Sequence, residues 1–262
     1  MGALHEGHFS LVRKSKKEND LTICSIYVNP TQFNDKHDFS SYPRNEQQDI
    51  DYLILENCDI LFLPKDHEIY VDTEDQIDHD VIEAMTVLEG EKRPGHFEGV
   101  VTIVNKLFNL ISPDVAYFGE KDYQQLWIIN LFTKKEKLNI EIKGCPTIRD
   151  QYGLALSSRN TKLSGLEIKH APRIFQALLF CKRKIELIKS KDEAINTQRL
   201  QKIKAESVNN FIKNSLIKLD YFEVIDNENF RFASEIKIAN SYRVLIAAHI
   251  GNIRLIDNIL IE

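Results

Sequence analysis

Residues 114–145, DVAYFGEKDYQQLWIINLFTKKEKLNIEIKGC, indicate the fold class most directly, because they contain a strand, a helix and a second strand in succession. Strand patterns cover 114–119 and 139–145, and a helical pattern covers 121–136 between them. Two strands joined through a helix lie parallel in one sheet. This stretch therefore predicts a parallel sheet with helices on its faces.

The same alternation fills the chain before this stretch, and it predicts a Rossmann-like, doubly wound parallel α/β domain over residues 1–147. Ligands of such sheets bind at the carboxyl ends of the strands. Pro43 suits the start of one helix, in which Ile50, Leu53 and Ile54 share a face. The predicted helices cover 9–20, 43–58 and 95–113, the predicted strands cover 21–30 and 59–64, and the helix over 95–113 carries an apolar stripe of Val100, Val104, Leu107, Phe108 and Ile111.

The pattern changes after residue 147, which predicts a smaller α+β domain over 148–262. A helical region begins with 166–190, and strands are expected over 221–226, 242–251 and 253–257. The short polar stretch GLALSSRN (153–160) is placed where two domains would meet. We expect the second domain to close over the site of the first.

Composition excludes several classes of protein. The 262 residues are 43% hydrophobic with a net charge of -5, which favours a globular protein with small substrates over a nucleic-acid binder. The KRK run at 182–184 is then expected to be a solvated helix face. No apolar run is long enough to span a membrane, and no signal peptide is visible. The four scattered cysteines predict reduced thiols and a cytoplasmic location.

The first eight residues, MGALHEGH, place two histidines three positions apart. If a helix begins near Gly7, His5 and His8 cluster at its N-terminal end, where free N–H groups and the helix dipole attract anions. This arrangement suits the phosphates of a nucleotide. Alternatively, the two histidines could form part of a metal site or simply cap the helix.

Other polar residues follow predicted strands, where a doubly wound fold builds its site. Lys121 is expected at a helix start, which the dipole disfavours but a bound polyphosphate would favour. Each group also has a plainer interpretation as turn or cap residues, and RPGHF (93–97) could be a Pro-Gly turn before a helix. The candidates are Asn29 and Gln32, then Gly119, Glu120, Lys121, Asp122, Gln124 and Gln125, and finally Ser157, Ser158 and Arg159.

Several motifs together closely resemble the pantothenate synthetase (pantoate:β-alanine ligase) family of the HxGH nucleotidyltransferase superfamily. The likeness covers nearly the whole chain in the right order. It implies that ATP and (R)-pantoate form pantoyl adenylate and pyrophosphate with Mg²⁺, after which the amine of β-alanine displaces AMP. The motifs are MGALHEGH, VNPTQF, YPR, LEGEKRPGHFEGVVTIVNKLFN, PDVAYFGEKDYQQ, GLALSSRN and RLIDN.

The resemblance also implies roles for individual residues, with His8 as the proposed proton donor. Tyr42 and Arg44 match a mobile segment that closes over the site, and the family suggests a homodimer through the N-terminal domain. Mg²⁺ is expected to be held mainly by the ATP phosphates. The catalytic set is His5, His8, Lys121 and Arg159; the ATP-binding set is Met1, Gly2, Ala3, Leu4, His5, Glu6, Gly7, His8, Gly119, Glu120, Lys121, Asp122, Ile148, Leu156, Ser157, Ser158 and Arg159; the pantoate and β-alanine set is Asn29, Gln32 and Gln125.

Two departures from the family pattern stand out. Tyr152 replaces an acidic residue before GLALSSRN. The family's first strand and its preceding helix are missing ahead of MGALHEGH, so we expect the upstream reading frame to encode roughly 20 more residues. The alternatives are another HxGH nucleotidyltransferase, an aminoacyl-tRNA synthetase, and a non-catalytic nucleotide-binding remnant disabled by truncation.

Overall fold

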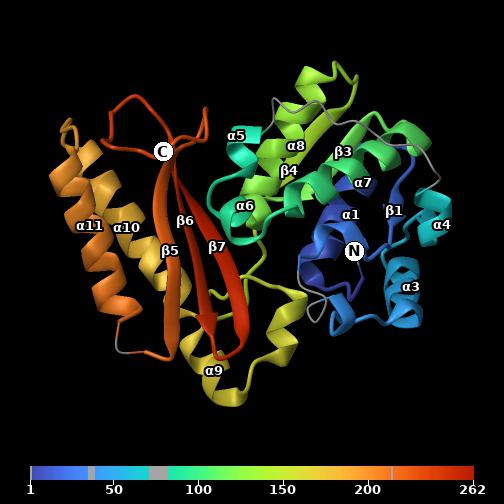
Figure 1. The fold of residues 1–262 in the computed structure, drawn as a ribbon, viewed down its shortest axis with the longest axis horizontal. Coiled ribbons are helices and arrows are strands. Elements are labelled where there is room, and N and C mark those ends of the chain that lie inside the picture. Colours follow the sequence, from blue (N-terminus) through green and yellow to red (C-terminus); the bar gives the residue numbers. More distant parts are fainter. Residues whose placement is uncertain (1, 35–38, 71–81, 214) are drawn as a thin grey trace. The chain divides into compact units, whose positions relative to one another are not determined.

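The computed structural model describes residues 2–34, 39–70, 82–213 and 215–262. The chain divides into two compact units, Met1–Ile148 and Arg149–Glu262. The boundary lies one residue after the predicted one. Figure 1 labels their elements, and each unit is described by itself. None of the helices within the described ranges is long and apolar enough to cross a membrane.

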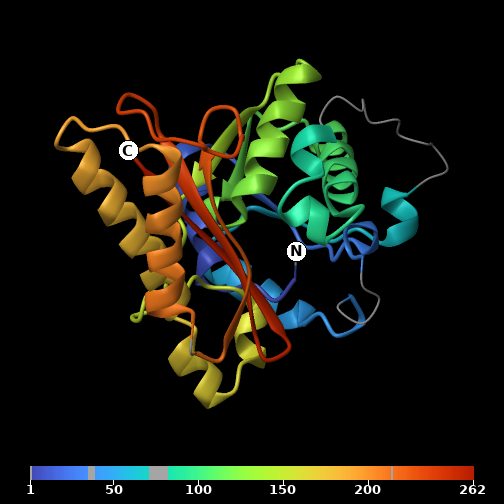
Figure 2. The same cartoon turned by 60° about the vertical axis from the view of Figure 1, so that its left-hand side comes forward.

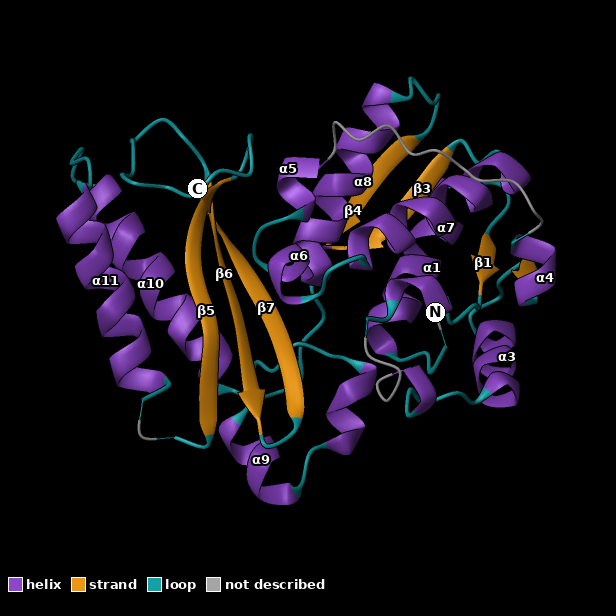
Figure 3. Ribbon diagram, viewed as in Figure 1, coloured by secondary structure: helices purple, strands orange, loops and turns teal. Residues whose placement is uncertain are grey.

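The first unit contains two pairs of parallel strands, as the alternating pattern predicts. β1 (Ile23–Ser25) pairs with β2 (Ile60–Phe62), and β3 (Val115–Gly119) pairs with β4 (Glu141–Cys145). Each pair is joined through at least one helix, because a parallel connection has to cross from one end of the sheet to the other. Helices and strands alternate along this unit (Figure 3).

The helices of the first unit bury the apolar residues that the sequence spaces along one face. α7, for example, buries Val100, Val104 and Phe108 in a cluster with Ile129 of α8. The helical elements are α1 (Glu6–Glu18), the 3-10 turn η1 (Pro30–Gln32), α3 (Glu46–Leu55), α4 (Asp66–Ile69), α5 (Ile82–Met85), α6 (Glu89–Lys92), α7 (His96–Ile111), the 3-10 turn η3 (Glu120–Asp122) and α8 (Tyr123–Lys135).

Two details of α3 differ from the prediction. The helix begins at Glu46 instead of Pro43, because the side chain of Asn45 accepts a hydrogen bond from the N–H of Gln48 and caps it there. Ile54 is 66% exposed and does not share the buried face of Leu53. That face is completed by a carboxylate, Asp49, which is 2% exposed.

The second unit packs two helices on a three-stranded antiparallel sheet. β5 (Ile217–Asp226), β6 (Tyr242–Ile250) and β7 (Ile253–Ile261) follow one another in the sheet, and β6 is buried along almost its whole length. α10 (Arg173–Lys189) and α11 (Thr197–Phe211) lie side by side on one face of it (Figure 2). The 3-10 turn η4 (Ser158–Lys162) and α9 (Gly165–His170) precede them.

The start of the second unit is fixed by a buried ion pair. Arg149 binds both carboxylate oxygens of Asp257 on β7, at 2.5 and 2.8 Å, and its guanidinium lies over the ring of Phe175. Tyr152, which precedes the GLALSSRN stretch, is 65% exposed. Its N–H donates to the carboxylate of Asp150, which closes a local turn.

Candidate active site

The first turn of α1 explains the spacing of the two histidines. His5 is the N-cap residue, and its Nδ1 accepts a hydrogen bond from the N–H of Gly7. His8 is the third residue of the helix, and its Nδ1 lies 3.3 Å from the N–H of His5. Since a backbone N–H can only donate, both Nδ1 atoms are acceptors. Each neutral imidazole therefore carries its proton on Nε2, away from the backbone.

Gly7 has a steric role in this turn. A Cβ at this position would lie 2.9 Å from Cε1 and 3.0 Å from Nδ1 of His5, closer than the ring can tolerate. The two imidazole centroids are 4.2 Å apart. Gly7 therefore lets the His5 ring fold over the helix start, beside His8.

Burial keeps both imidazoles neutral near pH 7. It lowers the pKa of His8 to about 3, with a further contribution from His5. Burial also lowers the pKa of His5, and Lys121 adds to this effect. Each ring can thus donate one Nε2–H hydrogen bond toward a developing negative charge.

Lys121 lies beside these histidines, in η3 at the end of β3. Its ammonium group is 3.4 Å from the carboxylate of Asp122, and its side chain is 19% exposed. The sequence predicts Lys121 at a helix start. In the structure α8 begins at Tyr123, so Lys121 lies two residues before it, in the 3-10 turn η3. The charge on Lys121 lowers the pKa of His5 and the charge on Asp122 raises it, so both charges act on this imidazole.

The turn that carries Asn29 and Gln32 is fixed against the start of α7. Asn29 is 1% exposed, and its amide nitrogen donates to the carbonyl oxygen of Gly99 at 3.0 Å. The hydroxyl of Tyr70 donates to the amide oxygen of Asn29 at 2.6 Å. A Cβ at Gly99 would lie 2.5 Å from the carbonyl oxygen of Thr31, so only glycine permits this approach.

His96 completes this contact, a role that the sequence pattern did not predict. Its Nδ1–H donates to the carbonyl oxygen of Gln32 at 2.8 Å, and its Nε2 accepts from the guanidinium of Arg93 at 3.0 Å. Burial, with Arg93 nearby, lowers the pKa of His96 to about 4. The signal was present in RPGHF, which is more than a Pro-Gly turn.

The two adjacent glutamines of α8 have different surroundings. Gln124 is 3% exposed and donates to the carbonyl oxygens of Ala84 and Val87, while it accepts from the N–H of Glu89. The side-chain amides of Gln125 and Gln32 form no hydrogen bond with any residue that the structure describes. Gln124 therefore holds a neighbouring segment, whereas the amides of Gln125 and Gln32 have no such partner among the described residues.

The remaining predicted residues are distributed over both units. His5 is flanked in sequence by Gly2, Ala3, Leu4 and Glu6. β3 ends at Gly119, and Glu120 follows it. Ile148 ends the first unit; Leu156, Ser157, Ser158 and Arg159 belong to the second, where the Ser157 hydroxyl accepts from the N–H of Arg159 and caps η4. Met1 lies outside the described residues.

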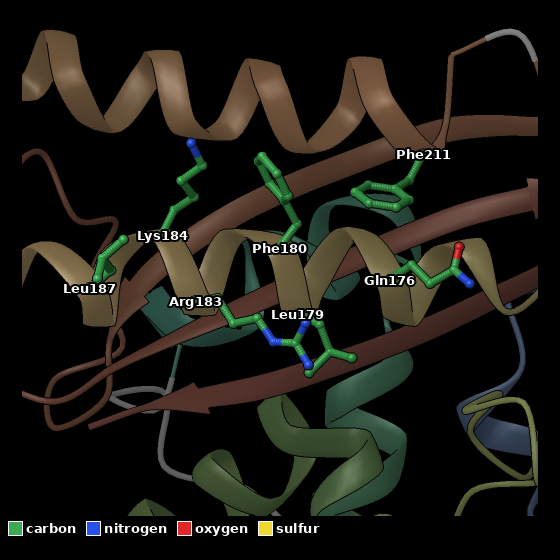
Figure 4. A pocket seen from close by; sticks show the side chains of 7 residues that line it. All are labelled: Gln176, Leu179, Phe180, Arg183, Lys184, Leu187 and Phe211. Atoms are coloured by element: carbon green, nitrogen blue, oxygen red, sulfur yellow. The ribbon is translucent and has the colours of Figure 1, made fainter.

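Two further features are the aromatic contacts of Tyr42 and Arg44 in the first unit and a hollow in the second. Tyr42 is buried with its ring 5.5 Å from that of Phe33, and the guanidinium of Arg44 lies over Phe39. A hollow of about 360 Å³ on α10 and α11 is lined by Gln176, Leu179, Phe180, Arg183, Lys184, Leu187 and Phe211 (Figure 4). None of these seven is a predicted site residue.

Comparisons with known proteins agree on one family. The family model described as pantoate-beta-alanine ligase matches residues 1–260. Pantothenate synthetase from Caldicellulosiruptor saccharolyticus is 43% identical over 262 residues, which cover 100% of this chain and 89% of that protein. The enzyme of the same name from Christiangramia forsetii is 42% identical over 263 residues, with the same two coverages.

Solved structures give the same result. Pantothenate synthetase from Thermus thermophilus superposes with a TM-score of 0.86 at 34% identity, over 99% of this chain and 90% of that one. Pantoate-beta-alanine ligase from Francisella tularensis, solved with beta-gamma ATP and beta-alanine, gives a TM-score of 0.76 at 38% identity, over 99% and 87%. The predicted Rossmann-like fold class is thereby confirmed.

Proposed function

The chain belongs to the pantoate-β-alanine ligase family and is an ATP-dependent ligase that joins pantoate to β-alanine, and from this we propose how its residues divide the reaction. A non-catalytic remnant is not favoured, since the family match extends over residues 1–260. The observation that carries the proposal is the pair of neutral imidazoles at the start of α1, each with Nδ1 occupied and its Nε2 proton available.

In the first step, a carboxylate oxygen of pantoate attacks the α-phosphorus of ATP. The new P–O bond gives pantoyl adenylate, and the bond to the β-phosphate breaks, so that pyrophosphate leaves with the electron pair. His5 and His8 donate hydrogen bonds to the charge that develops, and Lys121 supplies a positive charge beside them. Roles for Ser157, Ser158 and Arg159 of the second unit stay predictions from the resemblance.

In the second step, the amine of β-alanine attacks the acyl carbon of the adenylate. The C–N bond forms, the C–O bond to AMP breaks, and the amine loses a proton. Closure of the second unit over the site, which the sequence predicts, would keep water from the adenylate.

Mg²⁺ is proposed to arrive with ATP. Within the described ranges no group of three histidine, cysteine or carboxylate side chains could form a cage for a metal. In nucleotide sites Mg²⁺ keeps several of its waters and binds mainly through substrate phosphates. When bound, it would neutralise charge on the leaving pyrophosphate.

The homodimer and the cytoplasmic location also stay predictions; all four cysteines are free thiols, as expected.

The two-step mechanism predicts exchange of labelled pyrophosphate into ATP. We expect this exchange to need pantoate and Mg²⁺ but not β-alanine, because the adenylate forms before the amine acts. AMP release should likewise require pantoate and Mg²⁺. Exchange that occurs only after β-alanine is added would exclude the two-step assignment.

Gln125 and Gln32 are proposed to bind pantoate, whose two hydroxyls call for amides that donate and accept. Asn29, with its amide bonded inside the protein, supports the turn that carries Gln32. We expect Gln125→Ala to raise the KM for pantoate more than the KM for ATP. Steady-state kinetics with each substrate varied would test this, and an effect on ATP alone would remove Gln125 from the pantoate pocket.

A further inference from the structure

Asp49 is a buried carboxylate that none of the roles above uses. It lies in α3 and is 2% exposed. Its Oδ2 accepts a hydrogen bond from the N–H of Ala3 at 2.8 Å, and its Oδ1 accepts from the N–H of Leu4 at 2.7 Å. Burying a carboxylate is costly unless such bonds compensate for the lost water. The two bonds therefore define where the backbone of residues 3 and 4 must lie.

The segment that Asp49 holds has an unusual backbone. Ala3 has φ 55°, a left-handed conformation that is unfavourable for a residue with a Cβ. This conformation turns two consecutive N–H groups toward one anion, as in backbone nests. A Cβ on Gly2 would lie 3.6 Å from Oδ2 of Asp49, so the carboxylate also packs closely on the preceding residue.

The position of α3 does not depend on Asp49 alone. The ring of Tyr52 lies 5.1 Å from that of Phe9 on α1, and Leu53 packs with Val12 in an apolar cluster. Arg13 of α1 also binds Glu56 at the end of α3. These contacts join the two helices without Asp49, whereas its carboxylate, among the residues that the structure describes, bonds only to the segment before α1.

We propose that Asp49 is a positioning residue for ATP: it sets the backbone of residues 2–4, and through it the His5 cap, in the conformation that receives the nucleotide. The proposal rests on the proposed function, in which the two imidazoles contact ATP, and on the ATP contacts that the family resemblance implies for residues 2–8. Both oxygens of Asp49 accept a backbone N–H of this segment, so we assign it a positioning role and no direct contact with ATP.

The test compares Asp49→Asn with Asp51→Asn, an exposed aspartate of the same helix. In Asp49→Asn one acceptor becomes an NH₂ group facing a backbone N–H, so one bond is lost. We expect the KM for ATP to rise at least about tenfold while the KM for pantoate changes less than about twofold. Amide hydrogen exchange at Ala3 and Leu4 should accelerate by about tenfold or more. Asp51→Asn should change none of these.

Each other outcome is informative. An unchanged or lower KM for ATP in Asp49→Asn, or equal rises for both substrates, would overturn the proposal. If that variant does not fold, Asp49→Glu keeps the charge but moves it by one methylene, and its KM for ATP decides in the same way. Failure of the wild-type chain to release AMP would count against the proposed function instead. Amide hydrogen exchange at Ala3 and Leu4 would still test the Asp49 bonds in that case.

Discussion

Replacing His8 or Lys121 by alanine is expected to slow adenylate formation at least about a hundredfold. His8 offers an Nε2–H donor held in place by the N–H of His5, and Lys121 offers a charge beside it. Loss of one such preorganised group at a developing negative charge costs about 3 kcal/mol or more of transition-state stabilisation. Pyrophosphate exchange in the absence of β-alanine measures this step directly.

Matched controls exist on the same unit. His67 and Lys134 are exposed, and their alanine variants should keep normal exchange rates. The loss of the bond from the His5 N–H to the His8 ring in His8→Ala should cost about 1 kcal/mol of stability, and Lys121→Ala should cost less. Near-normal turnover in either site variant would show that its catalytic role is wrong.

Acidification from pH 7 to pH 5 is expected to destabilise the first unit by about 4 kcal/mol. Burial lowers the pKa of His8 to about 3 and that of His96 to about 4, both far below the usual 6.5. Between pH 6.5 and these values the unfolded chain binds protons that the folded chain does not, so stability falls as pH falls. From the unfolded-state pKa of 6.5 down to pH 5 is about 1.5 pH units, and each unit costs about 1.36 kcal/mol of unfolding free energy per histidine. Each histidine therefore contributes about 2 kcal/mol to the loss of stability at pH 5.

Urea unfolding at the two pH values, followed by fluorescence of Trp127, measures this loss. This residue is the chain's single tryptophan and lies in α8 of the same unit. In His96→Gln and His8→Gln the difference between pH 7 and pH 5 should shrink by about 2 kcal/mol each, whereas the exposed His67→Gln should leave it unchanged. An equal pH difference in all three variants would show that neither histidine is buried neutral.

The parallel strand pairs, the order of elements and the place of the histidine pair follow from the order of the amino acids alone. These depend on local spacing: apolar residues recur with the period of a helix or strand, and HEGH fixes its own capping turn within four residues. The family motifs are also contiguous in sequence, so the ligase activity could be inferred before any distance was known.

Long-range packing, by contrast, decides which partner each buried polar side chain finds. Asp49 bonds to Ala3, 46 positions away, and His96 bonds to Gln32, 64 positions away. Gln124 and Gln125 are identical neighbours in sequence, yet only the first is bonded within the part of the fold that the structure describes. Local spacing carries no information about such partners, because a buried polar group is satisfied by whatever donor or acceptor the packing brings to it.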